Sequence, residues 1–208
     1  MINLDINEIK NKIENRVPKV LDIIGEYSVL LPLIKVDEEW NVIFELRSMN
    51  LNTQPGEISF PGGKLEEGES FKEAATRETI EELRIKKDNI EVIGELDYLV
   101  SPSDISIHCF LGVISGVNVD NINPNPEEVD HIFTVPLKYF LENEPKVYNL
   151  KLETKFNAEF PYNLIPRGKD YNFREVLNKV CFYEYNDYII WGYTAKMIKN
   201  FIEILKDL

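Results

Sequence analysis

The stretch GGKLEEGESFKEAATRETIEELRI, residues 62–85, joins a glycine pair, an acidic loop and a glutamate-rich segment. Ser70 is followed three residues later by Glu73, the pattern of a capping box, in which each residue satisfies a free backbone amide at a helix start. We therefore predict a helix that begins at Ser70 and runs to about Leu83. This helix, with the glycine-rich turn before it, is the feature from which the fold can be worked out.

Three carboxylates share one face of the predicted helix. At 3.6 residues per turn, Glu78, Glu81 and Glu82 lie within an arc of roughly 100°. Like charges at i,i+3 and i,i+4 spacing repel each other by about a few tenths of a kcal/mol per pair. A hard divalent cation offsets this repulsion, and Mg²⁺ suits a site with few carboxylates and substrate phosphate oxygens. The alternative is a solvated acidic helix face, which is the usual place of a charge run.

The residues upstream of the helix favour the metal site. Gly62 and Gly63 allow positive φ values and close backbone approach. With the glutamates they form a pattern that resembles the Nudix box, G-x5-E-x7-R-E-U-x-E-E-x-G-U, where U is aliphatic. The matching positions, without a gap, are Gly63, Glu69, Arg77, Glu78, Glu81, Glu82 and Ile85. Thr79 stands at an aliphatic position, and Arg84 replaces the glycine that supports a left-handed helix end.

The resemblance implies roles for these residues. In this family Glu78 and Glu82 would bind the divalent ion directly. Glu81 would bind a second ion, bind through water or help to activate the nucleophile, so that all three glutamates are candidate metal ligands and catalytic residues. The implied cofactor is Mg²⁺, with Mn²⁺ as a substitute. Glu69 and Arg77 would pair as a structural brace, and a backbone carbonyl near residues 62–63 would complete the metal shell.

A second resemblance narrows the substrate. Residues 47–63, RSMNLNTQPGEISFPGG, resemble the extended signature of the coenzyme A pyrophosphatase branch, roughly R-S-x-x-L-x-x-x-x-G-E-[IV]-x-F-P-G-G. Residues 189–198, IIWGYTAKMI, resemble the I-W-G-x-T-A ending of that branch. Gln54 stands where a histidine is often found, so any role of that histidine does not transfer. The alternative interpretation of Phe60, Ile190 and Trp191 is packing in the core.

The branch implies that coenzyme A is split into 3′,5′-ADP and 4′-phosphopantetheine. Arg47 or Lys64 would hold a phosphate, although Arg47 is equally consistent with a solvated surface arginine. Glu81 or one of the glutamates at 127–128 would accept the proton from water. One alternative is a Nudix hydrolase of ADP-ribose or another nucleoside diphosphate derivative. Another is a non-catalytic Nudix module that senses a nucleotide, which predicts decay of a glutamate cluster that is complete here.

The composition limits the partners. The 208 residues carry a formal net charge of −13, which disfavours binding to nucleic acid and to anionic membranes. We expect a small-molecule diphosphate as partner; the sequence leaves a homodimer open.

No apolar run approaches about 18 residues, and the polar N-terminus has no signal peptide, which favours the cytoplasm. Cys109 and Cys181 are expected to be buried thiols, and the isolation of His108 and His131 argues against a zinc site.

The order of expected elements indicates an α+β fold in a single domain, residues 1–208. Residues 1–27 form a helical extension broken at Pro18, and residues 28–208 form the core. Pro32 predicts an edge position or a bulge. Strands are expected at 28–36, 41–46, 58–60, 90–100 and 105–113, a further strand or turn at 131–137, and further helices at 136–143 and 194–208. The Nudix resemblance implies an α/β/α sandwich around a mixed β-sheet.

Overall fold

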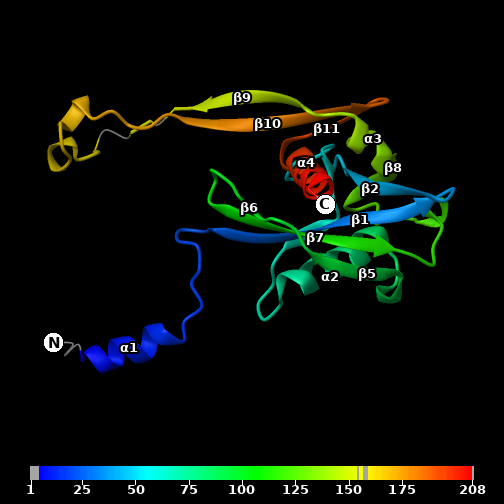
Figure 1. The fold of residues 1–208 in the computed structure, drawn as a ribbon, viewed down its shortest axis with the longest axis horizontal. Helices are drawn as coiled ribbons and strands as arrows, with labels where there is room; N and C mark the ends of the chain where they lie inside the picture. Colours follow the sequence, from blue (N-terminus) through cyan, green and yellow to red (C-terminus); the bar gives the residue numbers. More distant parts are fainter. Residues whose placement is uncertain (1–4, 154, 157–158, 208) are drawn as a thin grey trace.

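The computed structural model describes residues 5–153, 155–156 and 159–207 (Figure 1). The helices and strands, in chain order, are α1 (Ile6–Glu14), β1 (Gly25–Val36), β2 (Glu39–Arg47), β3 (Ile58–Ser59), β4 (Gly62–Lys64), α2 (Phe71–Leu83), β5 (Ile90–Glu95), β6 (Leu99–Val100), β7 (Ile105–Ile114), β8 (Val129–Pro136), α3 (Leu137–Glu142), β9 (Lys146–Leu152), β10 (Val176–Tyr185), β11 (Tyr188–Trp191) and α4 (Gly192–Lys206). Short 3₁₀ helices lie at Lys87–Asn89, Val119–Asn121, Tyr162–Leu164 and Gly168–Asp170.

A mixed sheet forms the centre of the molecule. Its main path runs in the order β3-β2-β1-β7-β5, and β1 pairs in parallel with β7 along residues 25–34 and 105–114. The other pairings are antiparallel, including β8 with β2 and β4 with β1. Helices lie on both sides of this sheet, with α2 on one side and α4 on the other (Figure 1). The expected α+β class and mixed Nudix sheet are therefore confirmed.

The two faces of the sheet have separate cores. Leu31, Val42 and Phe44 pack with the apolar face of α4, which buries Ile198 and Phe201. On the opposite face, neighbouring strand residues pack against α2: Leu30 contacts the cluster of Ala75, while Ile34 and Ile43 cluster with Leu83 and Ile85. Successive strand residues point to opposite faces, so β1 and β2 each supply both cores.

Two predictions about β1 need correction. Pro32 does not lie at an edge, because β1 runs between β7 on one side and β2 and β4 on the other. On the second side the register with β4 covers residues 27–29 and that with β2 covers 33–36. Pro32 falls in the gap between these two ladders, where its missing N–H removes no strand–strand hydrogen bond. The strand also begins at Gly25, three residues before its predicted start at residue 28.

Several local predictions are confirmed, and one region was missed. α2 begins after Ser70, whose backbone N–H donates to Glu73 at 2.8 Å while its Oγ accepts from the Glu73 amide at 3.3 Å. Pro136 is the N-cap residue of α3 rather than its first residue. The strand expected at 90–100 is interrupted between β5 and β6.

No element was predicted between residues 144 and 188, where β9, β10 and the start of β11 form a second sheet.

Two segments extend from the body of the molecule (Figure 1). Helix α1 lies apart from the sheets, and its apolar residues Ile6 and Ile13 are exposed. The β9–β10 hairpin extends from the second sheet, on the α4 side of the molecule (Figure 1). The division into an extension at 1–27 and a core at 28–208 stays a prediction. Within the described ranges, no helix has the length and apolar character that a membrane-crossing segment requires. Cys109 and Cys181 are buried, as expected.

Candidate active site

Arg77 organises the acidic face of α2. Its Nε and Nη2 atoms donate to the two carboxylate oxygens of Glu69 at 2.9 and 3.1 Å, and Nη2 also donates to the Lys64 carbonyl at 3.2 Å. Nη1 donates to Glu78 Oε1 at 2.8 Å and to Glu81 Oε2 at 3.4 Å. The hydrogen bonds from Arg77 lower the pKa of Glu69. The bidentate pair ties the loop before α2 to the second turn of the helix.

The glycine pair allows the backbone of β4 to approach these carboxylates. The Gly62 N–H donates to Glu82 Oε2 at 2.8 Å. A Cβ atom at Gly62 would lie 2.4 Å from the Ser28 carbonyl oxygen, and a Cβ atom at Gly63 would lie 2.2 Å from Glu78 Oε1. Any larger residue would therefore displace either strand β1 or the Glu78 carboxylate. The space that the two glycines leave at the site therefore accounts for their presence.

Glu45 is a site residue that the sequence analysis missed. It is fully buried in β2, and neither of its carboxylate oxygens has a hydrogen-bond partner among the described residues. Burial, and next the charge of Glu82, raise the pKa of Glu45 well above its usual range. The signal was present in NVIFEL, residues 41–46, where a single acid interrupts an apolar strand. Acids are almost never fully buried without a partner, so this position points to a site.

Burial governs the ionisation of the helix carboxyls. The side chain of Glu82 is buried, which raises its pKa to about 8; the Gly62 amide opposes this shift, and the charges of Glu78 and Glu128 add to it. Burial also raises the pKa of Glu78, against the effect of Arg77. Glu81 differs because its side chain is 55% exposed. The three predicted ligands are thus together, but at increasing depth from Glu81 through Glu78 to Glu82.

The loop at 124–128 brings a further acid to the same place. The Asn125 N–H donates to the carbonyl of Glu82 at 2.7 Å, and the Ser48 N–H donates to the carbonyl of Glu128 at 2.8 Å. These bonds hold Glu128 beside α2, and its charge raises the pKa of both Glu78 and Glu82. Glu128 is half-buried, whereas its neighbour Glu127 is exposed. Of the two acids proposed from sequence, Glu128 is the one that the fold places at the site.

Arg84 and Thr79 show how this chain accommodates its departures from the motif. Arg84 adopts the left-handed conformation expected of the missing glycine, with φ 53° and ψ 39°. Its Nη2 donates to Asn125 Oδ1 at 2.8 Å, which links the helix end to the loop that carries the further acid. The buried Thr79 donates its hydroxyl to the Ala75 carbonyl at 2.7 Å. An aliphatic position can hold threonine because that hydroxyl is satisfied within the helix.

The two proposed phosphate-binding residues are placed differently. Arg47 is half-buried at the end of β2, and its charge lowers the pKa of both Glu45 and Glu82. Its Nε atom has no hydrogen-bond partner among the described residues, while Nη2 donates to the Thr53 carbonyl at 3.5 Å. Lys64 is exposed on β4, and within the described ranges its ammonium makes no ion pair. Only Arg47 is brought into the carboxylate cluster.

The residues of this cluster fit a divalent cation. Among the described residues, no three ligating side chains converge in a ready-made cage, because Arg77 engages Glu78 and Gly62 engages Glu82. The buried oxygens of Glu45, however, accept no hydrogen bond from a fixed donor of the described residues, and the neighbouring acids add like charge. Unbalanced buried carboxylates are costly unless they are protonated or bind a cation. Oxygen ligands of this kind are the ones that Mg²⁺ prefers.

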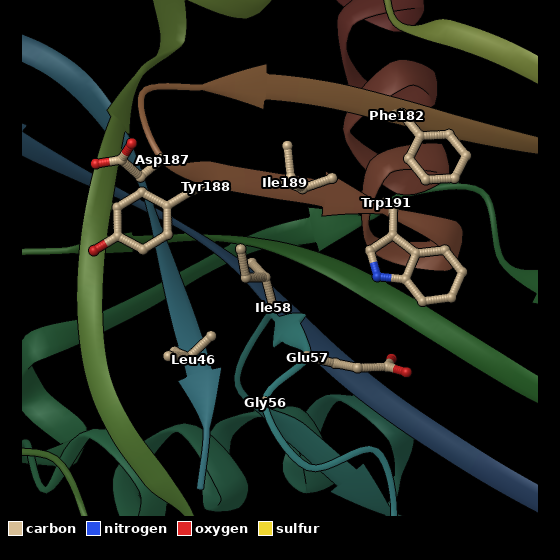
Figure 2. A pocket seen from close by; sticks show the side chains of 9 residues that line it. All are labelled: Leu46, Gly56, Glu57, Ile58, Phe182, Asp187, Tyr188, Ile189 and Trp191. Atoms are coloured by element: carbon tan, nitrogen blue, oxygen red, sulfur yellow. The ribbon is translucent and has the colours of Figure 1, made fainter. Parts of the chain in front are cut away.

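The C-terminal motif divides between core and surface. Phe60 and Ile190 are buried in the core on the α4 side. Trp191 is not, because 41% of its surface is exposed. The core interpretation of this tryptophan is therefore wrong. Its indole stacks on Phe182, with ring centroids 5.8 Å apart, at the rim of an open cavity (Figure 2).

A glycine turn, a braced glutamate helix and a mixed sheet together define a Nudix-type diphosphate site. Residues 28–155, more than half of the chain, match the NUDIX domain family. The chain belongs to the Nudix hydrolase family, whose members are enzymes that cleave diphosphate linkages. The family assignment made from the sequence motif is confirmed.

Known relatives place the chain within this family. It is similar to Nudix hydrolase 3 of Caenorhabditis elegans, with 29% identity over 86% of this chain and 72% of the relative. It is also similar to the peroxisomal coenzyme A diphosphatase NUDT7 of Mus musculus, with 32% identity over 83% of this chain and 67% of that protein. Two Nudix hydrolases of Arabidopsis thaliana are matched over only about half of their length, 52% and 55%.

A solved structure supports the fold. The crystal structure of a MutT/nudix family protein from Enterococcus faecalis aligns with a TM-score of 0.52 and 13% identity. The alignment covers 99% of this chain and 71% of that one. At this identity the comparison supports the architecture and carries no information on the substrate.

Proposed function

We propose that this enzyme hydrolyses the diphosphate linkage of coenzyme A or its derivatives, giving 3′,5′-ADP and 4′-phosphopantetheine. The observation that carries the proposal is the position of the 47–63 signature. This segment begins with Arg47 beside the carboxylate cluster and ends with the glycine pair that contacts Glu78 and Glu82. The signature is thus part of the wall around the site. The similarity to a coenzyme A diphosphatase from mouse points in the same direction.

The proposed metal ligands are Glu78 and Glu82, with Glu81 at the exposed edge for a second ion. Mg²⁺ is the proposed cofactor, and Mn²⁺ would substitute for it. When bound, the ion would neutralise the diphosphate oxygens and polarise the attacking water. Arg77 keeps the Glu78 carboxylate oriented through the 2.8 Å contact. The Gly62 amide does the same for Glu82, so the chain fixes both carboxylates before substrate arrives.

The chemical step is attack of water on one phosphorus atom of the diphosphate. The new P–O bond forms as the bridging P–O bond breaks, and the second phosphate leaves with the bonding electron pair. The water proton passes to a carboxylate, for which we propose Glu128 or Glu81. Glu128 is held beside the site by the Ser48 amide, whereas Glu81 is more exposed and already contacts Arg77. A general base needs hydrogen-bond reach, which favours Glu128, because its backbone is held beside the site and its side chain is half-buried.

The negative charge of the product and substrate requires cations from the chain itself. The guanidinium of Arg47, whose charge lowers the pKa of Glu45 and Glu82, is the proposed phosphate contact at the inner side of the site. Lys64 is the proposed contact at the outer side, on the exposed strand β4. Both residues supply positive charge near the site in a chain whose formal net charge is −13.

A substrate panel tests the proposal. The full chain is incubated with Mg²⁺ and coenzyme A, acyl-coenzyme A, dephospho-coenzyme A, ADP-ribose, NADH or diadenosine polyphosphates, and products are identified by mass. We expect kcat/KM for coenzyme A to exceed that for dephospho-coenzyme A and ADP-ribose by roughly tenfold, about one charged contact. Equal hydrolysis of ADP-ribose would contradict the coenzyme A assignment but not diphosphate hydrolysis. Binding without turnover of any compound would indicate a non-catalytic module.

A further inference from the structure

An open cavity lies on the sheet face opposite to α2. It has a volume of about 540 Å³ and lies between the β10–β11 hairpin and the ends of β2 and β3 (Figure 2). Leu46 lines it from β2, whereas the adjacent Glu45 and Arg47 belong to the carboxylate cluster. The cavity therefore begins one residue away from the catalytic cluster, on the other side of the same strand.

The lining combines apolar surface with negative charge. Trp191, Ile189 and Tyr188 line it from β11, and Ile58 lines it from β3. The charged groups in the lining are Glu57 and Asp187, and among the described residues no lysine, arginine or histidine lines it. A phosphate group would be repelled here, because nothing compensates its charge. The cavity suits an uncharged, partly apolar part of a ligand.

One wall of the cavity also offers peptide groups. β11 is the edge strand of the sheet β11-β10-β9, so one side of its backbone has no strand partner in the described sheet. In Figure 2 the strand lies between β10 and the end of β3. The Thr194 hydroxyl, which donates to the Ile58 carbonyl at 3.1 Å, fixes the start of α4 to β3 below it. An edge strand binds extended ligands that carry amide groups, through main-chain hydrogen bonds.

The cavity is at a suitable distance from the diphosphate site. The four residue-to-residue steps from Ile58 to Gly62 span at most about 14 Å of extended chain. The pantetheine arm of coenzyme A has a backbone of about the length of four peptide residues, at three atoms per residue. It contains two amides and a branched apolar group, and it carries no charge beyond its phosphate. β3 is the edge strand of the path β3-β2-β1-β7-β5, so an arm that starts at a phosphate near Gly62 can pass around this edge to the cavity.

We propose that the cavity between β11 and the ends of β2 and β3 binds the pantetheine arm of the substrate, with Trp191 and Ile189 against its apolar part and the β11 edge against its amides. The inference rests on the proposed function and adds the orientation of the substrate. The 3′-phosphoadenosine half then lies on the other side of the diphosphate, outside the cavity that Glu57 and Asp187 line. The tryptophan of the C-terminal motif thereby has a binding role rather than a core role.

The first test measures binding without turnover. The chain has two tryptophans, Trp40 and Trp191, which are 40% and 41% exposed. The variant Trp40→Phe leaves Trp191 as the sole indole, and Trp191→Phe leaves Trp40 as a matched control on the far end of β2. Both proteins are titrated in EDTA with pantetheine and, separately, with 3′,5′-ADP. We expect a saturable change in emission with pantetheine in the Trp40→Phe protein alone.

The second test separates the two halves of the substrate by kinetics. In Trp191→Ala we expect KM for coenzyme A and Ki for 4′-phosphopantetheine to rise roughly tenfold, the size of one lost apolar contact. The Ki for 3′,5′-ADP should stay within about twofold of its value in the parent protein. Trp40→Ala, the same change at equal exposure, should alter none of these constants. Ile189→Asp, which keeps the tryptophan that precedes α4, should repeat the pattern by adding a third acid.

The outcomes distinguish the two proposals. If the parent enzyme does not cleave coenzyme A, the proposed function fails, and the fluorescence titration still decides whether pantetheine binds at Trp191. If coenzyme A is cleaved but pantetheine leaves Trp191 emission unchanged, the cavity assignment is wrong. A response to 3′,5′-ADP in place of pantetheine, or an equal rise of both Ki values, would place the nucleotide half in the cavity and also overturn the assignment.

Discussion

The two faces of the mixed sheet differ in chemistry, although strand β2 builds both. Toward α4 the strand presents Phe44 in an apolar core with stacked Phe60 and Phe133. Toward α2 it presents Glu45, buried without a hydrogen-bond partner among the described residues. Burial of apolar surface on the first face stabilises the fold. Burial of a carboxyl group on the second face lowers the free energy of unfolding but places an acid at the site. One strand separates these tasks because its side chains alternate.

The largest effect is expected on the apolar face. Phe44→Ala removes a fully buried ring and leaves a cavity, which should lower the free energy of unfolding by about 3–5 kcal/mol. Urea unfolding in EDTA measures this. Trp40→Ala, on an exposed part of the same strand, is the control and should change the value by less than about 1 kcal/mol. A loss below about 1 kcal/mol in Phe44→Ala would mean that this face is not the main core.

The next effect concerns turnover on the α2 face. Glu82→Gln and Glu78→Gln should each lower kcat by at least about 100-fold, or about 2.7 kcal/mol, through loss of the charge that holds the cation. Steady-state kinetics at saturating Mg²⁺ measures this, with coenzyme A as substrate. Glu203→Gln, a helical glutamate on α4, should retain full activity. Near-normal turnover in either site variant would exclude that residue as a ligand.

Glu45 allows a direct comparison of stability and metal binding. Replacing a buried charge by an apolar side chain of similar size is often stabilising, so Glu45→Met should raise the free energy of unfolding in EDTA by about 1–3 kcal/mol. The increase in Tm caused by Mg²⁺ should become smaller. Glu39→Met, at the exposed start of the same strand, should leave both quantities unchanged. A destabilised variant with an unchanged Mg²⁺ response would show that Glu45 serves packing alone.

The brace on α2 should affect stability with a defined pH dependence. Glu69→Gln removes a charge-assisted pair with Arg77 and should cost about 1 kcal/mol at pH 7, with little change in kcat. The pKa of Glu69 is lowered in the folded chain, so this contribution is present above the unfolded pKa of about 4.3 and is lost as pH falls through the lower folded value. Unfolding curves of parent and variant should therefore converge in acid. Glu67→Gln, at an exposed position of the same loop, is the control and should unfold like the parent at every pH. A Glu69→Gln variant that is inactive but as stable as the parent would contradict the brace.

The smallest effect is expected at the end of α2. Arg84→Gly relieves a left-handed backbone, worth about 1 kcal/mol, and loses an exposed hydrogen bond to Asn125, worth about 0.5 kcal/mol. The net change in the free energy of unfolding should be a gain of about 0.5 kcal/mol. Arg84→Ala loses the bond without relieving the backbone and should be destabilised. Thermal melts of the two variants must therefore shift in opposite directions; a shift in the same direction would disprove the strain.

The features that sequence predicted well are local in the chain. The capping box at Ser70 and the spacing of Glu78, Glu81 and Glu82 depend on helix geometry within a few turns, and the structure has both. The class of fold followed from the clustering of strands and from the motif. Pro32 was misplaced because its strand neighbours come from distant segments, and a local pattern contains no information about where one ladder ends and another begins.

The family, the glutamate helix and its brace could all be predicted from the sequence, because each depends on residues close together in one helix and its preceding loop. Contacts between distant segments are what bring Glu45 to Glu82, place Glu128 beside them and make Trp191 part of a cavity wall. These contacts join β2, the 124–128 loop and β11 to segments far away in the chain. Which face a strand residue occupies depends on register, and a shift of one residue would send Glu45 into the apolar core.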